Sequence, residues 1–179
     1  MINLIIIGLI IFLKFAIPAA ITFFPFAAGW ANFVLDTIDG DILIPLGMQD
    51  AAYQPIDKIA DWFTYAGMVA AAWRFKWCIK KWIYGLFAFR SIGQAAFLLT
   101  GNERFFFYFP NFLEPLFLIY ATILFFKKSN QPQAWQFFLK HKISLAAFII
   151  IYKMQDEYFT HLANLDRTDF FRQLFSKFF

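Results

Sequence analysis

The sequence predicts an all-α integral membrane protein, a polytopic bundle of five to six transmembrane helices followed by an amphipathic C-terminal helix. Apolar residues make up 61% of the 179 residues and charged residues only 16%, against about 25% charged in soluble domains. The apolar residues also gather in stretches that approach the roughly 20 residues a membrane-spanning helix needs. We expect one integral membrane domain over 1–179, with the bundle in 1–152 and an interfacial tail in 153–179.

The first apolar stretch, residues 2–35, carries Lys14 as its only charge. At a rise of about 1.5 Å per residue, one straight helix of this length would be too long for a single crossing. Pro18 and Pro25 interrupt it, because proline removes a helical hydrogen bond. We therefore expect a crossing near 2–24 and a second, shorter helix near 26–39. A single kinked and steeply tilted helix is the alternative.

Loop-forming residues then fill a connection over 40–54, and Pro55 suits the first turn of a helix that ends near Trp73. A short polar turn over 100–104 separates two of the later apolar segments. The remaining predicted helices cover residues 82–99, 109–126 and 143–152. The last of these is short for a crossing, so we expect it to begin earlier, near Trp135, or to continue into the tail.

The tail combines aromatic residues at helical spacing with interleaved basic residues. This pattern is typical of a helix that lies in a membrane interface, and equally of a helix packed against the bundle. The apolar positions are Phe170, Phe171, Leu174, Phe175 and Phe178, and the basic ones are Arg167, Arg172 and Lys177.

Lysine and arginine concentrate in two connections, 74–81 and 127–142. Their position between apolar segments favours loops that flank a membrane over nucleic-acid binding as the reason for the net charge of +4. Two crossings separate the two connections, so they lie on one side, which basic loops predict to be cytoplasmic. The 40–54 connection and the 100–104 turn should then lie outside.

Four aspartates surround the 40–54 connection. Asp36 and Asp39 are spaced i, i+3, while Asp57 and Asp61 are spaced i, i+4, so each pair shares one helix face. Because the two helices are consecutive, their carboxylates can converge at one membrane surface, where they need protons, cationic side chains or a bound cation. An all-oxygen cluster suits Mg²⁺ or Mn²⁺, so the predicted cofactor is a divalent cation. Ordinary solvated helix ends are the alternative.

The order of these aspartates resembles the signature of the CDP-alcohol phosphotransferase family, D-x-x-D-G-x-x-A-R, eight residues, then G-x-x-x-D-x-x-x-D. The matching positions are Asp36, Asp39, Gly40, Asp57 and Asp61. Leu43 and Ile44 replace the Ala-Arg pair of the family, and Tyr53 replaces its second glycine. The resemblance implies that Asp36, Asp39 and Asp57 hold a divalent metal beneath a CDP diphosphate. It also implies that Asp61 is the base acting on the incoming alcohol, and that Gly40 belongs to the substrate site.

Two further charges lie inside predicted spans. Arg90 and Glu114 belong to consecutive helices that form a hairpin, so the two can meet at similar depth and lower the cost of burying each other. Such a pair is either a structural clamp or part of substrate binding, with Arg90 holding a phosphate, or of an ion path. His161 would join the aspartates only if the last helix leaves the membrane on their side.

These observations favour an integral membrane protein with a metal-binding aspartate site at one membrane face. The reaction we expect is transfer or hydrolysis of a phosphate-bearing lipid precursor, with the bilayer as the surroundings and a lipid as the substrate. Two alternatives stay open. One is a non-enzymatic subunit or assembly factor of a membrane complex, including a homo-oligomer, and the other is a cation or proton transporter.

Overall fold

The computed structural model describes residues 2–162, and this part of the chain is all-helical, with no β-strand. Most of the predicted interfacial tail, including its aromatic positions, lies outside the described residues. The helices are α1 (Ile2–Ile21), α2 (Pro25–Leu43), α3 (Asp50–Arg74), α4 (Lys80–Thr100), α5 (Arg104–Tyr108), α6 (Leu113–Phe126) and α7 (Gln131–Glu157), followed by a π-helical turn, Tyr158–Leu162.

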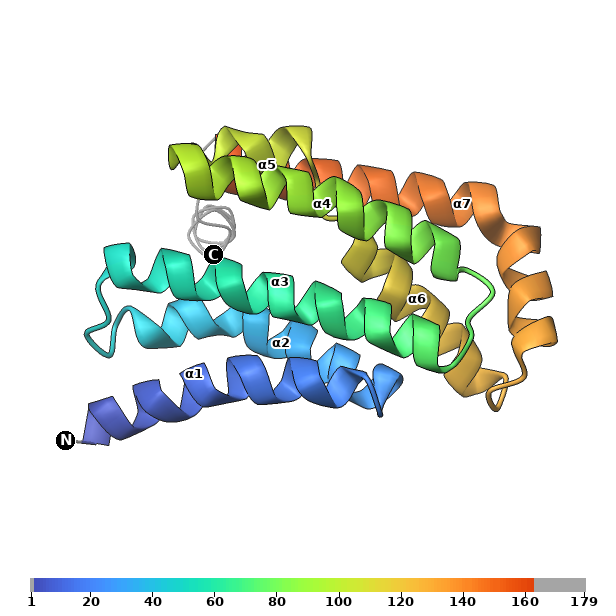
Figure 1. Ribbon diagram of the computed structural model, residues 1–179, viewed down its shortest axis with the longest axis horizontal. Coiled ribbons are helices and arrows are strands. Elements are labelled where there is room, and N and C mark those ends of the chain that lie inside the picture. Colours follow the sequence, from blue (N-terminus) through green and yellow to red (C-terminus); the bar gives the residue numbers. More distant parts are fainter. Residues whose placement is uncertain (1, 163–179) are drawn as a thin grey trace, which may run out of the picture.

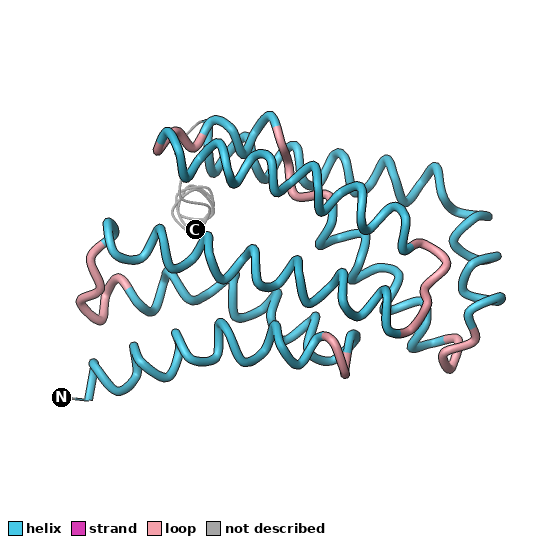
Figure 2. The backbone as a smooth tube through the Cα atoms, viewed as in Figure 1, coloured by secondary structure: helices cyan, strands magenta, loops and turns pink. Residues whose placement is uncertain are grey.

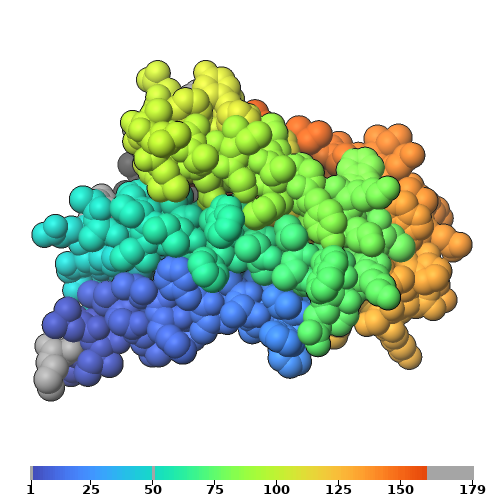
Figure 3. All heavy atoms as spheres, in the orientation of Figure 1, coloured from blue at the N-terminus to red at the C-terminus, as the bar shows by residue number. Residues whose placement is uncertain are grey.

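The helices form two groups with α6 running obliquely between them (Figure 1). The first three helices pack side by side, and Figure 3 shows α1 lying against α3 across one face of the molecule. On the other side α4 lies beside α5, and α7 packs on α6. The α3–α4 and α6–α7 connections lie at one end of the bundle, whereas the α2–α3 and α4–α5 connections lie at the other (Figure 1).

Three helices of the described chain are long and apolar enough to cross a membrane: Ile2–Ile21, Lys80–Thr100 and Gln131–Thr160. Much of the outer surface is also apolar. Trp30, Val34 and Ile38 repeat every four residues along the exposed side of α2, and α3 exposes Ile59 and Phe63. A surface of this kind is suited to lipid rather than water.

The first apolar stretch forms two helices, as predicted, because the chain breaks before Pro25, which occupies the first turn of α2. Pro18, in contrast, lies inside α1 without ending it. Its carbonyl oxygen faces α3 at Gly67, where a Cβ atom would lie only 2.5 Å away. Glycine at this position therefore allows α1 and α3 to approach closely.

The helices that carry the aspartates are longer than the sequence predicted. The expected 40–54 connection shrinks to residues 44–49, because α2 continues to Leu43 and α3 begins at Asp50 rather than Pro55. Gly47, at a φ of +105°, makes the tight turn between them. The aspartates consequently lie one or more turns inside their helices, not at the helix ends.

The second half of the chain contains two further corrections. The basic connection predicted over 127–142 is confined to 127–130, because Asn130 caps α7 by accepting a hydrogen bond from the N–H of Gln133. The helix expected at 109–126 begins only at Leu113, after the short α5, which the sequence did not predict. As expected, the last helix both begins before residue 143 and continues past 152. Figure 2 shows that α7 bends, so that its first part runs across the end of the bundle.

The apolar core lies between α3, α4 and α6, towards the end with the basic connections. Its largest fully buried side chains include Trp77, Phe117, Tyr120 and Met68. The Trp77 ring packs against those of Phe117 and Tyr120, at centroid distances of 4.9 and 5.3 Å. The polar interior begins where this core ends, in the other half of the bundle.

Candidate functional site

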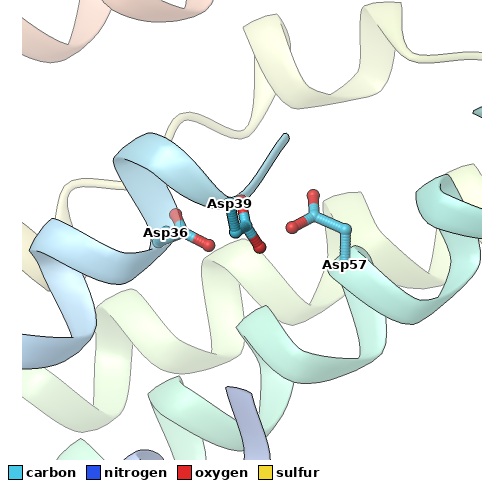
Figure 4. A group of neighbouring side chains, drawn as sticks. All are labelled: Asp36, Asp39 and Asp57. Carbon is cyan, nitrogen blue, oxygen red and sulfur yellow. The ribbon is translucent and has the colours of Figure 1, made fainter. Parts of the chain in front are cut away.

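The aspartates converge between α2 and α3, as their spacing predicts. Carboxylate oxygens of Asp36, Asp39 and Asp57 all lie within 4.8 Å of one another. Figure 4 shows the two carboxylates of α2 and the carboxylate of α3 directed toward one another. Asp39 is fully buried and Asp57 nearly so, whereas Asp36 is 39% exposed. The three oxygens are therefore close enough to share one cation.

Lys14 of α1 supplies a cation to this group. Its ammonium donates to Asp39, to Oδ1 of Asp57 at 2.5 Å and to Oδ1 of Asp36 at 3.4 Å, and its side chain is only 4% exposed. A buried ammonium without such partners would be strongly unfavourable. The only charge of the first apolar stretch therefore lies where three carboxylates meet.

Two further side chains of α3, Lys58 and Tyr53, contact these carboxylates. Lys58 donates to Oδ2 of Asp57 at 2.8 Å and lies 3.7 Å from Oδ2 of Asp61. The Tyr53 hydroxyl donates to Oδ1 of Asp39 at 2.9 Å and lies 3.4 Å from Oδ1 of Asp57. We call Asp36, Asp39, Asp57 and Asp61, with Lys14 and Lys58, the aspartate cluster. Its four carboxylates face two ammonium groups, so two formal negative charges are in excess.

Gly40 packs against Tyr53 beside the aspartate cluster. Its N–H donates to Oδ1 of Asp39 at 2.8 Å, and a Cβ atom at this position would lie 3.2 Å from the Tyr53 hydroxyl. Glycine therefore leaves room for the tyrosine. Tyr53, whose hydroxyl donates to Asp39, therefore packs directly against Gly40.

A second polar group, the arginine network, lies between α3, α4, α6 and α7. It consists of Tyr65, Arg90, Asn111, Glu114 and Glu157. Arg90 forms its ion pair with Glu157 at 3.2 Å rather than with Glu114, and it donates to the Phe109 carbonyl at 2.7 Å. The direct ion-pair partner of Arg90 is thus Glu157 and not Glu114, because the bundle brings the end of α7 against the arginine.

Asn111 forms hydrogen bonds with the other members of the arginine network. Asn111 donates through its side chain to the Tyr65 hydroxyl at 3.0 Å and to Glu114 at 3.2 Å, while its backbone N–H donates to Glu157 at 2.9 Å. Glu114 in turn donates its own N–H to the Asn111 side-chain oxygen. Glu114 and Arg90 therefore belong to one hydrogen-bonded group without touching as an ion pair.

The two polar groups adjoin each other across one ring. Lys58 lies 5.4 Å and Arg90 4.6 Å from the centroid of Phe106, so the buried ring contacts a cation from each group. Gln94 donates to the Lys58 carbonyl at 3.3 Å, which connects α4 to the aspartate cluster. A layer of charged residues therefore crosses the whole width of the bundle.

Sequence reasoning missed four members of these groups, Lys14, Lys58, Tyr65 and Glu157. Lys14 carried a signal, because a lone charge in an apolar stretch is usually functional, and Lys58 directly follows Asp57. Glu157 carried none that pointed to Arg90. His161 lies in the π-helical turn, but its side chain is outside the described part of the structure.

No family model, curated protein or solved structure that was compared with this chain matches it. The resemblance to the CDP-alcohol phosphotransferases therefore rests on the aspartate pattern alone. The geometry adds that the residues of this pattern lie together between α2 and α3.

Proposed function

We propose that this protein is a membrane-embedded enzyme that binds one divalent cation in the aspartate cluster and acts on a phosphate-bearing lipid precursor. The observation that carries this proposal is the gathering of four carboxylates around only two ammonium groups in a largely buried cluster, a formal excess of two negative charges. One divalent cation would neutralise that excess, and carboxylate oxygens are the ligands that Mg²⁺ and Mn²⁺ prefer.

The residues divide into three roles. Asp36, Asp39 and Asp57 would hold the cation, because their oxygens already lie within 4.8 Å of one another. The cation would supply charge stabilisation for a phosphate group of the substrate. Asp61 lies on the Lys58 side of the cluster, outside the triad, and would accept the proton of the attacking hydroxyl. Lys58 contacts both Asp57 and Asp61 and would orient the Asp61 carboxylate.

The position of the Tyr53 side chain, against two carboxylates of the cluster, favours a substrate other than a CDP-lipid. Its hydroxyl lies against both Asp39 and Asp57, in the position where the CDP-alcohol phosphotransferase signature has glycine. We infer a diverged relative of that family whose substrate carries a smaller phosphate group. The transporter alternative gains no support, because the interior toward the basic end is the apolar core around Met68 and Phe117.

We further propose that five to six helices enter the bilayer, with α2 and α3 joining the three long apolar helices. The apolar exposed faces of α2 and α3 support this count, and α6, at 14 residues, is the short additional one. The basic connections would face the cytoplasm. Cys78, the only cysteine, is exposed in one of them, so an impermeant maleimide should label it only after cells are lysed.

The proposed cation site is tested by Mn²⁺ binding to the purified protein in detergent, followed by electron paramagnetic resonance of the free ion. We expect about one ion per chain, and Asp57→Asn should weaken binding by more than about tenfold because a ligand is lost. Asp41→Asn is the matched control, since Asp41 is an exposed aspartate on the same helix as the triad's Asp36 and Asp39. It should leave the affinity within about twofold.

Catalysis is tested separately with Asp61→Asn, by following phosphate-bearing products from a panel of lipid diphosphates. This variant should keep Mn²⁺ binding but lose turnover by about 10²-fold or more, as expected for removal of a general base. Absence of Mn²⁺ binding at millimolar concentration would overturn the proposal. The remaining interpretation would then be the non-enzymatic subunit, in which the two lysines and protons on the other carboxylates balance the cluster.

A further inference from the structure

Charge is strongly segregated along this chain. The stretches 62–102 and 115–155 contain no aspartate or glutamate, yet they carry ten of the sixteen basic residues. The acidic residues of the described chain all lie outside these two stretches. The basic residues of interest here are Arg74, Lys76, Lys80, Lys81, Lys127, Lys128, Lys140 and Lys142, which we call the basic rim.

The fold brings the basic rim together at one end of the bundle. The α3–α4 and α6–α7 connections lie at this end (Figure 1), and Gln131 donates to the Phe75 carbonyl at 3.4 Å, which bridges them. Every residue of the rim is exposed or partly exposed. Within the described chain none of them forms an ion pair. Eight like charges at one end of the bundle therefore have no ion-pair partner among residues 2–162, which is unfavourable unless anions are nearby.

Two of these lysines occupy backbone positions that favour glycine. Lys76 and Lys128 follow the ends of α3 and α6 with φ values of 51° and 50°. A side chain in this left-handed conformation costs about 1 kcal/mol relative to glycine. At both helix ends, therefore, a lysine occupies an exposed position where glycine would be less strained.

The first part of α7 extends this surface. It runs across the end of the bundle, where its atoms cover the right-hand side of Figure 3. Phe137 and Leu139 are 40% and 41% exposed beside the exposed Lys140, and Lys127 lies 5.4 Å from the Phe137 ring centroid. Exposed apolar and basic side chains on one helix are typical of segments that lie in a lipid interface.

We propose that the basic rim binds the headgroups of anionic phospholipids. Large apolar side chains flank the cations, with Trp73 71%, Trp82 63% and Phe126 74% exposed. The occupant must therefore join an anionic head to apolar chains, which nucleic acids and inorganic phosphate do not. This surface lies away from the aspartate cluster, so its role does not depend on the proposed reaction.

The proposal is tested on the full-length protein in detergent, titrated with phosphatidylglycerol or with phosphatidylcholine and followed by its thermal unfolding midpoint and by native mass spectrometry. Phosphatidylglycerol should bind and raise the midpoint, and its affinity should fall with added salt. Phosphatidylcholine of the same chain length should do neither.

The matched variants locate the binding surface. Replacing Lys81, Lys128 and Lys140 together by glutamine should weaken phosphatidylglycerol binding by more than about tenfold, because each charge near an anionic surface contributes about fivefold. Arg104→Gln, an exposed cation at the opposite end, should change it by less than about twofold. Equal binding of both lipids, equal binding of glycerol phosphate without chains, or an unaffected triple variant would overturn the proposal.

Discussion

The aspartate cluster and the arginine network are both buried between helices, but they balance their charges differently. In the arginine network Arg90 and Glu157 pair one to one, and the second carboxylate, Glu114, accepts a hydrogen bond from Asn111, so one formal negative charge is in excess. In the aspartate cluster four carboxylates share two ammonium groups, so two are in excess, and oxygens of three of these carboxylates lie within 4.8 Å of one another. A paired and hydrogen-bonded group is typical of structure, whereas several carboxylates close together can accept a divalent cation.

The same comparison explains why the arginine network is the weaker site candidate. Buried charges are tolerated when they are paired, so a closed network needs nothing else. One atom of the network, Nε of Arg90, and one of the nearby Gln94, Oε1, lack hydrogen-bond partners within the described residues. They are one donor and one acceptor, so they leave no net charge to be neutralised.

The largest effect is expected from breaking the balanced pair. Arg90→Met should lower the free energy of unfolding in detergent by about 3–5 kcal/mol, because it leaves Glu157 buried without its cation. Denaturant titration of the solubilised protein measures this. Adding Glu157→Gln to the same variant should recover much of the lost unfolding free energy. A double variant no more stable than Arg90→Met would show that the Arg90–Glu157 pair does not hold α4 against α7.

Two glycines allow close packing in different parts of the bundle, and replacing either one should lower stability. Gly67→Ala and Gly93→Ala each place a Cβ atom 2.5 Å from a neighbour, the Pro18 carbonyl oxygen and the Phe109 Cβ. Each should lower stability by about 1–3 kcal/mol through overpacking. Gly85→Ala is the control, since nothing lies within 4 Å of its added Cβ and alanine favours helix, so it should not destabilise. Similar thermal midpoints for all three variants would contradict the packing argument.

Changing the charge balance should separate the two groups. Lys14→Met removes a cation that contacts three carboxylates, so Mn²⁺ affinity should rise by about tenfold or more despite some loss of stability. Arg90→Met removes the cation of the arginine network, which has only two carboxylates and no triad of ligand atoms among the described residues, so it should create no comparable gain. Mn²⁺ titration of the two variants checks this, and weaker binding by Lys14→Met would mean that Lys14 organises the ligands instead of competing with the ion.

The smallest effects concern single hydroxyl groups. Tyr53→Phe removes a donor to Asp39, and Tyr65→Phe removes an acceptor for Asn111, so each should cost about 1 kcal/mol in unfolding free energy. Only Tyr53→Phe should also alter Mn²⁺ affinity, because Tyr65 contacts none of the proposed ligands. A change in Mn²⁺ affinity with Tyr65→Phe would show that the two groups act as one.

Helices were easier to predict than their ends. The break before Pro25 followed from the missing N–H of proline, but Pro18 and Pro55 both lie inside helices, because packing against neighbours offsets the loss of one hydrogen bond. Likewise Gly40 and Asp41 read as loop residues, yet α2 includes them. The short α5 was missed because five residues carry too little pattern to identify a helix.

The convergence of the aspartates was predictable, but what lies among them was not. Spacings of three and four residues set which carboxylates share a face, and this is a local property of a helix. The ammonium of Lys14 reaches Asp39 and Asp57 from 25 and 43 residues away. No periodicity within one helix reports such a contact, and the same holds for Arg90, whose partner comes from the end of α7.

The sequence by itself determined the all-α class, the long apolar helices as a type and the grouping of the aspartates, but it predicted five to six spans where three helices of the described chain are long and apolar enough to cross a membrane. These follow from hydrophobicity and helical periodicity, which act over a few turns of chain. Only the tertiary structure decided which cations meet which carboxylates, because that depends on how α1 packs against α2 and α3. The packing gives Arg90 a carboxylate partner of its own but gathers four carboxylates around two ammonium groups, and the proposed function rests on that difference.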